Sequence, residues 1–182
     1  MRIAIPVYRA SHEPTPAQLK SGRYRKRKWS WAGLTIAIEN EAGSVRRGTN
    51  RAGEDWETRM LFAYGEIEES MGVDGDKVDV FVGPNPDAPN VYVVHQRRSG
   101  DWEKYDEDKS MICFDSEEDA KAAFLGCYSD PRFLGPITTM PVAVFVEKVL
   151  ATKGKPAMIK AIPLLISRPR RAGRRDAMLL VS

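Results

Sequence analysis

One short stretch limits this chain more than any other, because three aspartates stand within six residues beside an apolar run. Asp74, Asp76 and Asp79 belong to this stretch, and Gly83 closes the run behind them. Alternation of apolar residues predicts a buried strand over residues 78–82. Crowded carboxylates raise one another's pKa values unless cations neutralise them. Since hard divalent ions prefer oxygen ligands, the stretch predicts a site for Mg²⁺ or Mn²⁺.

The same residues have a plainer interpretation, an acidic turn that only solvates a loop. A calcium-binding EF-hand loop is excluded. Counted from Asp74, its fifth position is Val78 and its twelfth is Asn85, where a glutamate is required.

The composition fits one globular domain without a membrane span. Hydrophobic residues make up 42% and charged residues 29% of 182 residues, and no apolar stretch is long enough to cross a bilayer, so no membrane partner is expected. Cys113 and Cys127 stand alone, without the spacing of a metal site or a disulfide framework. A reducing cytoplasm is the expected compartment.

The net charge of +3 conceals two basic ends on an acidic body. Residues 1–29 hold eight Lys and Arg against one acid, and residues 168–182 hold five Arg against one acid. We therefore expect a basic arm over 1–29, a domain over 30–166 and a basic tail over 167–182. Such ends predict contact with nucleic acid or with the acidic surface of a neighbouring subunit in a homo-oligomer.

The periodicity predicts strands first and helices after. Strands are expected at 29–39, 44–48, 57–64, 78–82, 91–96 and 109–114. Ser116 and Asp119 form a capping box for a first helix, and a second helix is expected from Pro141, with Thr139 near its N-cap. This order indicates an α+β domain, a small antiparallel, OB-like β-barrel flanked by helices.

Several motifs together resemble the soluble inorganic pyrophosphatase family. Its signature of three aspartates is matched by Asp74-Gly75-Asp76-Lys77-Val78-Asp79, and its Tyr-Gly-Tyr-Ile motif by Tyr64-Gly65-Glu66-Ile67, ten residues upstream. Residues 83–96 resemble the pyrophosphatase-like domain found in proteins of tailed phages and mobile elements. The resemblance covers about residues 34–130 and implies the family's pyrophosphatase fold.

The resemblance also implies a chemistry, the Mg²⁺-dependent hydrolysis of pyrophosphate or a related phosphoanhydride, such as a nucleotide, by metal-activated water. Mn²⁺ is the alternative metal. Asp76 would orient or deprotonate the water. The metal ligands would be Asp74, Asp79 and one of Asp106 and Asp108. The substrate would be held by Arg46, Arg59, Tyr64, Lys109 and Tyr128, with Tyr64, Arg59 and Lys109 also acting in catalysis.

The chain departs from the family pattern at three positions. Lys77 replaces a proline, Ser129 a lysine, and Ala37 a metal-associated glutamate for which Glu39 or Glu41 would substitute. These departures are expected to affect the rate of hydrolysis before they affect the binding of the substrate.

Several alternatives remain open. Arg47 competes with Arg46, Tyr64 and Tyr128 would also serve as core aromatics, and His95 is interpreted as structural. For the whole chain the alternative is a non-catalytic phage structural protein or a nucleic-acid-binding accessory protein that reuses the fold. A phage-encoded protein would lie in the host cytoplasm or the virion.

Overall fold

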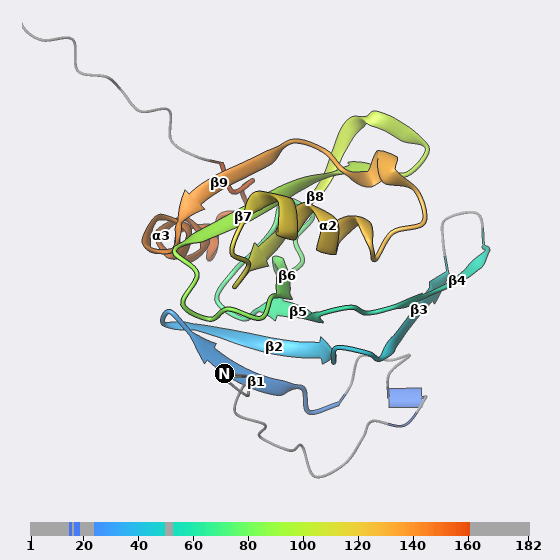
Figure 1. The fold of residues 1–182 in the computed structure, drawn as a ribbon, viewed down its shortest axis with the longest axis horizontal. Coiled ribbons are helices and arrows are strands. Elements are labelled where there is room, and N and C mark those ends of the chain that lie inside the picture. Colours follow the sequence, from blue (N-terminus) through green and yellow to red (C-terminus); the bar gives the residue numbers. More distant parts are fainter. Residues whose placement is uncertain (1–14, 16, 19–23, 50–52, 161–182) are drawn as a thin grey trace, which may run out of the picture.

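A mixed sheet of seven strands forms the centre of the molecule, in the order β1-β2-β5-β6-β8-β7-β9. In this computed structural model, residues 15, 17–18, 24–49 and 53–160 are described. Neighbouring strands are antiparallel except β6 and β8, which are parallel. The sheet curls strongly into a half-barrel (Figure 1). Its strands are β1 (Arg27–Trp31), β2 (Leu34–Asn40), β5 (Ala63–Ile67), β6 (Asp79–Val82), β7 (Asn90–Arg98), β8 (Asp101–Ile112) and β9 (Ile137–Pro141).

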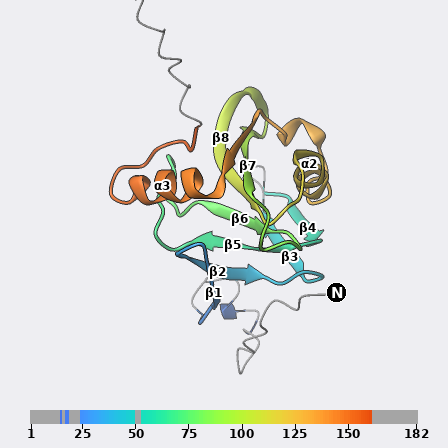
Figure 2. The ribbon, with the colours of Figure 1, turned by 60° about the vertical axis from the view of Figure 1, so that its left-hand side comes forward.

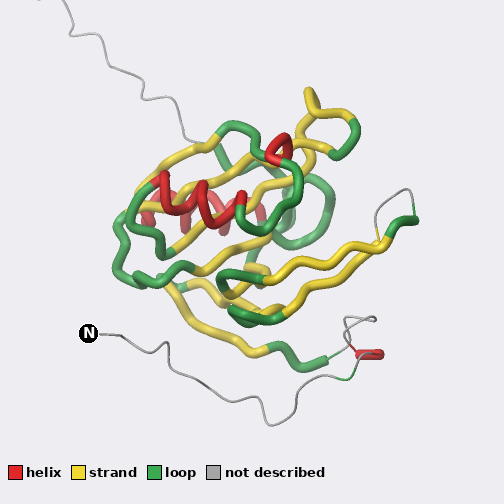
Figure 3. Tube along the Cα trace, turned by 45° about the vertical axis from the view of Figure 1, so that its right-hand side comes forward, coloured by secondary structure: helices red, strands yellow, loops and turns green. Residues whose placement is uncertain are grey.

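A hairpin, two helices and a short turn surround the sheet. Strands β3 (Val45–Thr49) and β4 (Asp55–Arg59) pair as a separate hairpin that extends beyond it (Figure 3). Helices α2 (Glu117–Leu125) and α3 (Val142–Thr152) lie on different sides of β7 and β8 (Figure 2). A short 3₁₀ turn, η1 (Pro131–Phe133), precedes β9. No helix in these described segments is long and apolar enough to cross a membrane.

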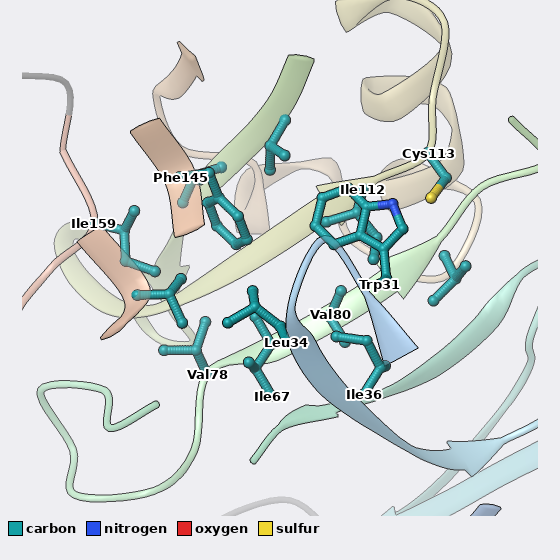
Figure 4. Packing of buried hydrophobic residues seen from close by; sticks show 14 of the residues in the cluster. Trp31, Leu34, Ile36, Ile67, Val78, Val80, Ile112, Cys113, Phe145 and Ile159 are labelled. Carbon is teal, nitrogen blue, oxygen red and sulfur yellow. The ribbon is translucent and has the colours of Figure 1, made fainter. Parts of the chain in front are cut away.

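Alternation along the strands gives the sheet two different faces. In β6, Val80 and Val82 belong to one buried cluster and Phe81 to another. The first cluster packs under α3 through Phe145 (Figure 4). The second packs under α2 through Phe124. Asp79 shares the face of Phe81, and this face carries the polar residues described below.

The structure confirms the α+β class and refines the predicted elements. Ala32 and Gly33, with φ of 49° and 83°, form a two-residue turn that divides the predicted strand 29–39 into β1 and β2. The predicted strand 57–64 is likewise two strands, β4 and β5. The predicted strand 109–114 is the end of a longer strand, because β8 begins at Asp101 and includes the acidic residues 106–108. β9 was not predicted from the sequence.

Both predicted helices are present. Ser116 caps α2 by accepting a hydrogen bond from the Asp119 N–H at 3.1 Å. Pro141 occupies the N-cap position of α3, and Thr139 lies in β9 just before it. The predicted basic arm overlaps β1, which begins at Arg27; residues 1–14 and 161–182 lie outside the described part.

A buried polar network joins β7, β8, β9 and the segment after α3. Nδ1 of His95 lies 2.6 Å from Asp108 Oδ1, and its Nε2 lies 2.7 Å from Thr138 Oγ1. The other Asp108 oxygen accepts the backbone N–H of Ile159 at 2.7 Å. Both oxygens of the Asp108 carboxylate therefore form hydrogen bonds that stabilise the fold.

We expect Asp108→Ala to lower the free energy of unfolding by roughly 2–3 kcal/mol, because His95 and the Ile159 N–H lose a buried partner. Asp106→Ala is the matched control, since Asp106 is partly exposed and lies 3.6 Å from Arg98; its effect should stay within about 0.5 kcal/mol. Urea unfolding of both variants measures the difference. Equal effects would contradict the assignment of Asp108 to the fold.

Candidate active site

Lys109 is the centre of the polar face. Its side chain is buried, 3% exposed, and its ammonium forms ion pairs with Asp79 and, at 2.9 Å, with Glu107. The same ammonium donates to the Tyr64 hydroxyl at 3.2 Å. The sheet explains the meeting, because Asp79 and Lys109 are register partners in the parallel pair. Glu107 lies two residues before Lys109 and so shares its face.

Two carboxylates share this one ammonium, and their pKa values move apart. Burial raises the pKa of Asp79, but Lys109 outweighs burial and leaves that pKa below its usual value. Burial also raises the pKa of Glu107, and Lys109 only partly offsets it, so this pKa stays above the usual value. Burial opposes the charge of Lys109, yet its surrounding acidic groups keep the pKa well above normal. The trio therefore holds one ammonium between two carboxyls of unequal acidity, Asp79 the stronger acid and Glu107 the weaker.

Aromatic and basic residues border the trio. Burial raises the pKa of the Tyr64 hydroxyl well above its usual value, so it stays a neutral donor. The Arg46 guanidinium lies 4.5 Å from the centre of the Tyr64 ring and 5.4 Å from that of Trp56. Tyr128 stacks on Phe124, with ring centres 4.4 Å apart, and burial raises its pKa to about 12.

The β3–β4 hairpin decides between the two candidate arginines. Arg46 faces the Tyr64 ring, whereas its neighbour Arg47 points away and pairs with Glu57 at 3.2 Å. Arg59 is exposed and is the register partner of Val45, so it lies on the face of the hairpin opposite Arg46. The structure therefore brings Arg46 to the Lys109 group and leaves Arg59 at the surface.

Asp74 and Asp76 lie in the exposed loop that leads into β6. The Asp76 N–H donates to Asp74 Oδ1 at 3.1 Å, and Gly75 between them adopts a φ of 90°. Burial and Asp108 raise the pKa of Tyr105, and Asp74 adds to the rise, which places Asp74 near β8. Neither loop aspartate pairs with Lys109.

The remaining predicted ligands of β8 lie apart from this group. Asp106 is next to Arg98, and Asp108 faces the first cluster through His95 and Ile159. Two acids that sequence reasoning passed over are on the polar face instead, Glu107 and Glu66. The available signal was the two-residue spacing from Lys109 to Glu107, which is informative once 101–112 is known to be a strand.

The oxygen atoms near Glu107 are of the types that a hard metal ion binds. Gln96 is buried, and its amide N–H donates to Glu107 Oε1 at 3.1 Å. Its carbonyl oxygen is buried and has no hydrogen-bond partner among the residues that the structure describes. Carboxylate and amide oxygens are ligands that Mg²⁺ accepts. Within the described ranges, however, no three His, Cys, Asp or Glu side chains are arranged to hold a metal ion together.

The comparison with protein families identifies the chain. The family description "Inorganic Pyrophosphatase" matches residues 16–150. This chain belongs to the inorganic pyrophosphatase family. The match spans the polar face and the hairpin. No individual curated protein matches the sequence significantly.

Among solved structures, the chain is similar to an inorganic pyrophosphatase from Coxiella burnetii. The two share 17% identity over 59% of this chain and 82% of that one, with a TM-score of 0.28. The family match alone places the chain in the pyrophosphatase family, and the candidate site is inferred from the contacts around Lys109.

We expect Lys109→Met to lower the free energy of unfolding at pH 7 by roughly 3–5 kcal/mol, because Asp79 and Glu107 lose their shared counter-ion. The pH dependence should also become steeper between pH 7 and pH 4, because in the wild type only Glu107 of these two carboxyls, through its raised pKa, makes stability rise as the pH falls in this range. The lowered pKa of Asp79 stabilises the wild type above the unfolded value of about 3.9, and this stability is lost as the pH falls through the folded pKa. In the variant, unpaired buried carboxyls bind protons more readily than the unfolded chain does, so its stability should rise as the pH falls from 7 toward 4.

Urea unfolding across this pH range measures both effects. Lys104→Met is the control, since Lys104 is exposed and pairs with Asp101 at 2.7 Å, and its effect should be small at every pH. A penalty that stays constant with pH would contradict the shared-ammonium interpretation.

Proposed function

We propose that this protein hydrolyses inorganic pyrophosphate, or a related phosphoanhydride, with Mg²⁺ as cofactor and Mn²⁺ as its substitute. The observation that carries the proposal is the buried group of Lys109, Asp79, Glu107 and Tyr64 in a chain of this family. The group combines carboxylates for a metal with donors for a phosphate. Buried charges with shifted pKa values gather at functional sites, which favours an enzyme over a non-catalytic protein.

The donors would bind and orient the substrate. Lys109 and Arg46 supply positive charge, and Arg46 is held in place by the Tyr64 ring at 4.5 Å. Tyr64 and Tyr128 keep their protons at neutral pH because burial raises both pKa values. Each hydroxyl is thus able to donate to a phosphate oxygen.

The acids would serve the metal and the water. Asp79 and Glu107 would offer carboxylate oxygens to Mg²⁺, and the loop residue Asp74 would have to move toward them to become a third ligand. Asp76 would orient or deprotonate the attacking water. When bound, Mg²⁺ would supply charge for the phosphate oxygens and lower the pKa of a coordinated water. We prefer Glu107 to Asp106 or Asp108 because it alone of the three pairs with Lys109. Arg59 is exposed on the other face of the hairpin, so it would contact the substrate only at the edge of the site.

Phosphate release from pyrophosphate by the full chain should require Mg²⁺ and stop with a chelator. Asp79→Asn and Asp76→Asn should each lower kcat at least about 100-fold while the protein stays folded, because Glu107 still pairs with Lys109 and Asp76 is exposed. Asp101→Asn, at the far end of β8, is the control and should keep full activity. Thermal melting checks the fold of each variant.

Metal-independent hydrolysis, or full activity in both active-site variants, would refute the proposal. Release of phosphate from a nucleoside triphosphate but not from pyrophosphate would keep the chemistry and change the substrate. Binding of nucleic acid without any hydrolysis would support the non-catalytic alternative.

We further propose that the basic ends bind an acidic partner and are dispensable for hydrolysis. A chain shortened to residues 24–160 keeps Lys26, which pairs with Glu39 at 2.7 Å, and the buried Ile159. It should retain pyrophosphate turnover and lose DNA retention. The full chain's retention should fall steeply with salt. If the shortened chain folds but does not hydrolyse pyrophosphate, the ends are needed for hydrolysis and the proposal is wrong.

A further inference from the structure

Glu66 lies on the polar face next to the proposed metal carboxylate. Register partners run across four strands from Ala37 to Glu66, to Asp79 and to Lys109. Residues in one such row share a face, and directly opposite antiparallel neighbours have Cβ atoms about 5 Å apart. The Glu66 carboxylate is thus adjacent to Asp79, on the side away from Lys109. Two neighbouring carboxylates would ordinarily attract a divalent cation.

Lysines from two other segments reach this carboxylate. Lys26 Nζ lies 2.9 Å from Glu66 and 2.7 Å from Glu39. Lys77, within the three-aspartate signature, lies 3.7 Å from Glu66 and 2.9 Å from Glu68. The Lys26 and Glu66 side chains are only 18% and 22% exposed. These contacts are therefore less screened by solvent than ordinary surface ion pairs.

Lys26 is held in its charged form by the groups around it. Burial acts to lower its pKa, but hydrogen bonds to Glu39 and Glu66 outweigh burial and raise it. The lysine stays an ammonium throughout the range in which pyrophosphate chemistry would operate. Its charge is part of the chain and is present at any metal concentration.

We propose that Lys26 and Lys77 act as built-in cations that exclude a divalent ion from Glu66. A metal ion at Glu66 would lie within a few ångströms of two ammonium groups, and this repulsion would weaken its binding. Glu66 lies near two ammonium groups, whereas Asp79 and Glu107 share a single one, so the Asp79 and Glu107 side of the row remains the more favourable place for a divalent ion. The inference deepens the proposed function, because it rests on metal use there, and it predicts how many ions the face accepts.

Removal of either positive charge should open the excluded site. Lys77→Met and Lys26→Met keep most of the apolar stem while they remove the ammonium. We expect each variant to bind Mn²⁺ about tenfold more tightly than the wild type, or to bind one more ion per chain. The full chain would be titrated with Mn²⁺ alone, with the free ion followed by electron paramagnetic resonance, so that hydrolysis is not the readout.

Two controls test the cause. Lys104→Met removes a lysine paired with Asp101, distant in the strand from this row, and should leave Mn²⁺ binding unchanged. The double variant Lys77→Met with Glu66→Gln should return to wild-type binding, because the newly freed carboxylate is gone. Circular dichroism confirms the fold, and Lys77→Gln replaces Lys77→Met if the latter does not fold.

Unchanged Mn²⁺ affinity and stoichiometry in both folded lysine variants would overturn the inference. A gain that persists in the double variant would overturn it as well, since Glu66 would then not be the ligand. The proposed function fails separately, through absent phosphate release in the wild type. A wild type without turnover whose lysine variants still gain Mn²⁺ would retain the inference about Glu66 alone.

Discussion

The ion pairs of one buried ammonium determine how the candidate site is built. Removing Lys109 from water costs several kcal/mol unless opposite charges and hydrogen bonds replace the lost hydration. Asp79, Glu107 and Tyr64 provide that replacement from β6, β8 and β5. The strand order must therefore be correct before the charges can meet. The site and the fold are consequently coupled, and a change in either affects the other.

The parallel pairing of β6 and β8 is the topological step that creates the site. β8 lies between β6 and β7, so the chain leaves β6, forms β7 and returns between them. Asp79 and Lys109 thus become register partners although thirty positions separate them. The same pairing places Val80 beside Ser110 on the other face, under α3. One face packs under α3, while the other packs under α2 and also carries the polar residues around Lys109.

Two of the three departures from the family pattern, Ala37 and Lys77, have a common explanation on this polar face. Ala37 lacks the carboxylate expected there, but its cross-strand partner Glu66 carries one. Lys77, in place of a proline, pairs with the acids of the same region. Glu66 thus places a carboxylate on the strand next to Ala37, and Lys26 and Lys77 are its cations. The proposed consequence is a face that needs fewer divalent ions, because the chain supplies part of the positive charge.

The sequence by itself determined the α+β class, the capped start of α2 and the family resemblance, and it suggested Asp79, Lys109, Tyr64 and one of Arg46 and Arg47 as site residues. These follow from local patterns, since periodicity, capping residues and motif spacing are all encoded in neighbouring residues. Only the tertiary structure decided which acid of β8 joins Lys109, which arginine of β3 faces Tyr64, and that Asp108 belongs to the fold. Each of those choices depends on the face to which a side chain points. A one-residue change of strand register reverses that face, and register is fixed by pairing between strands distant in the sequence.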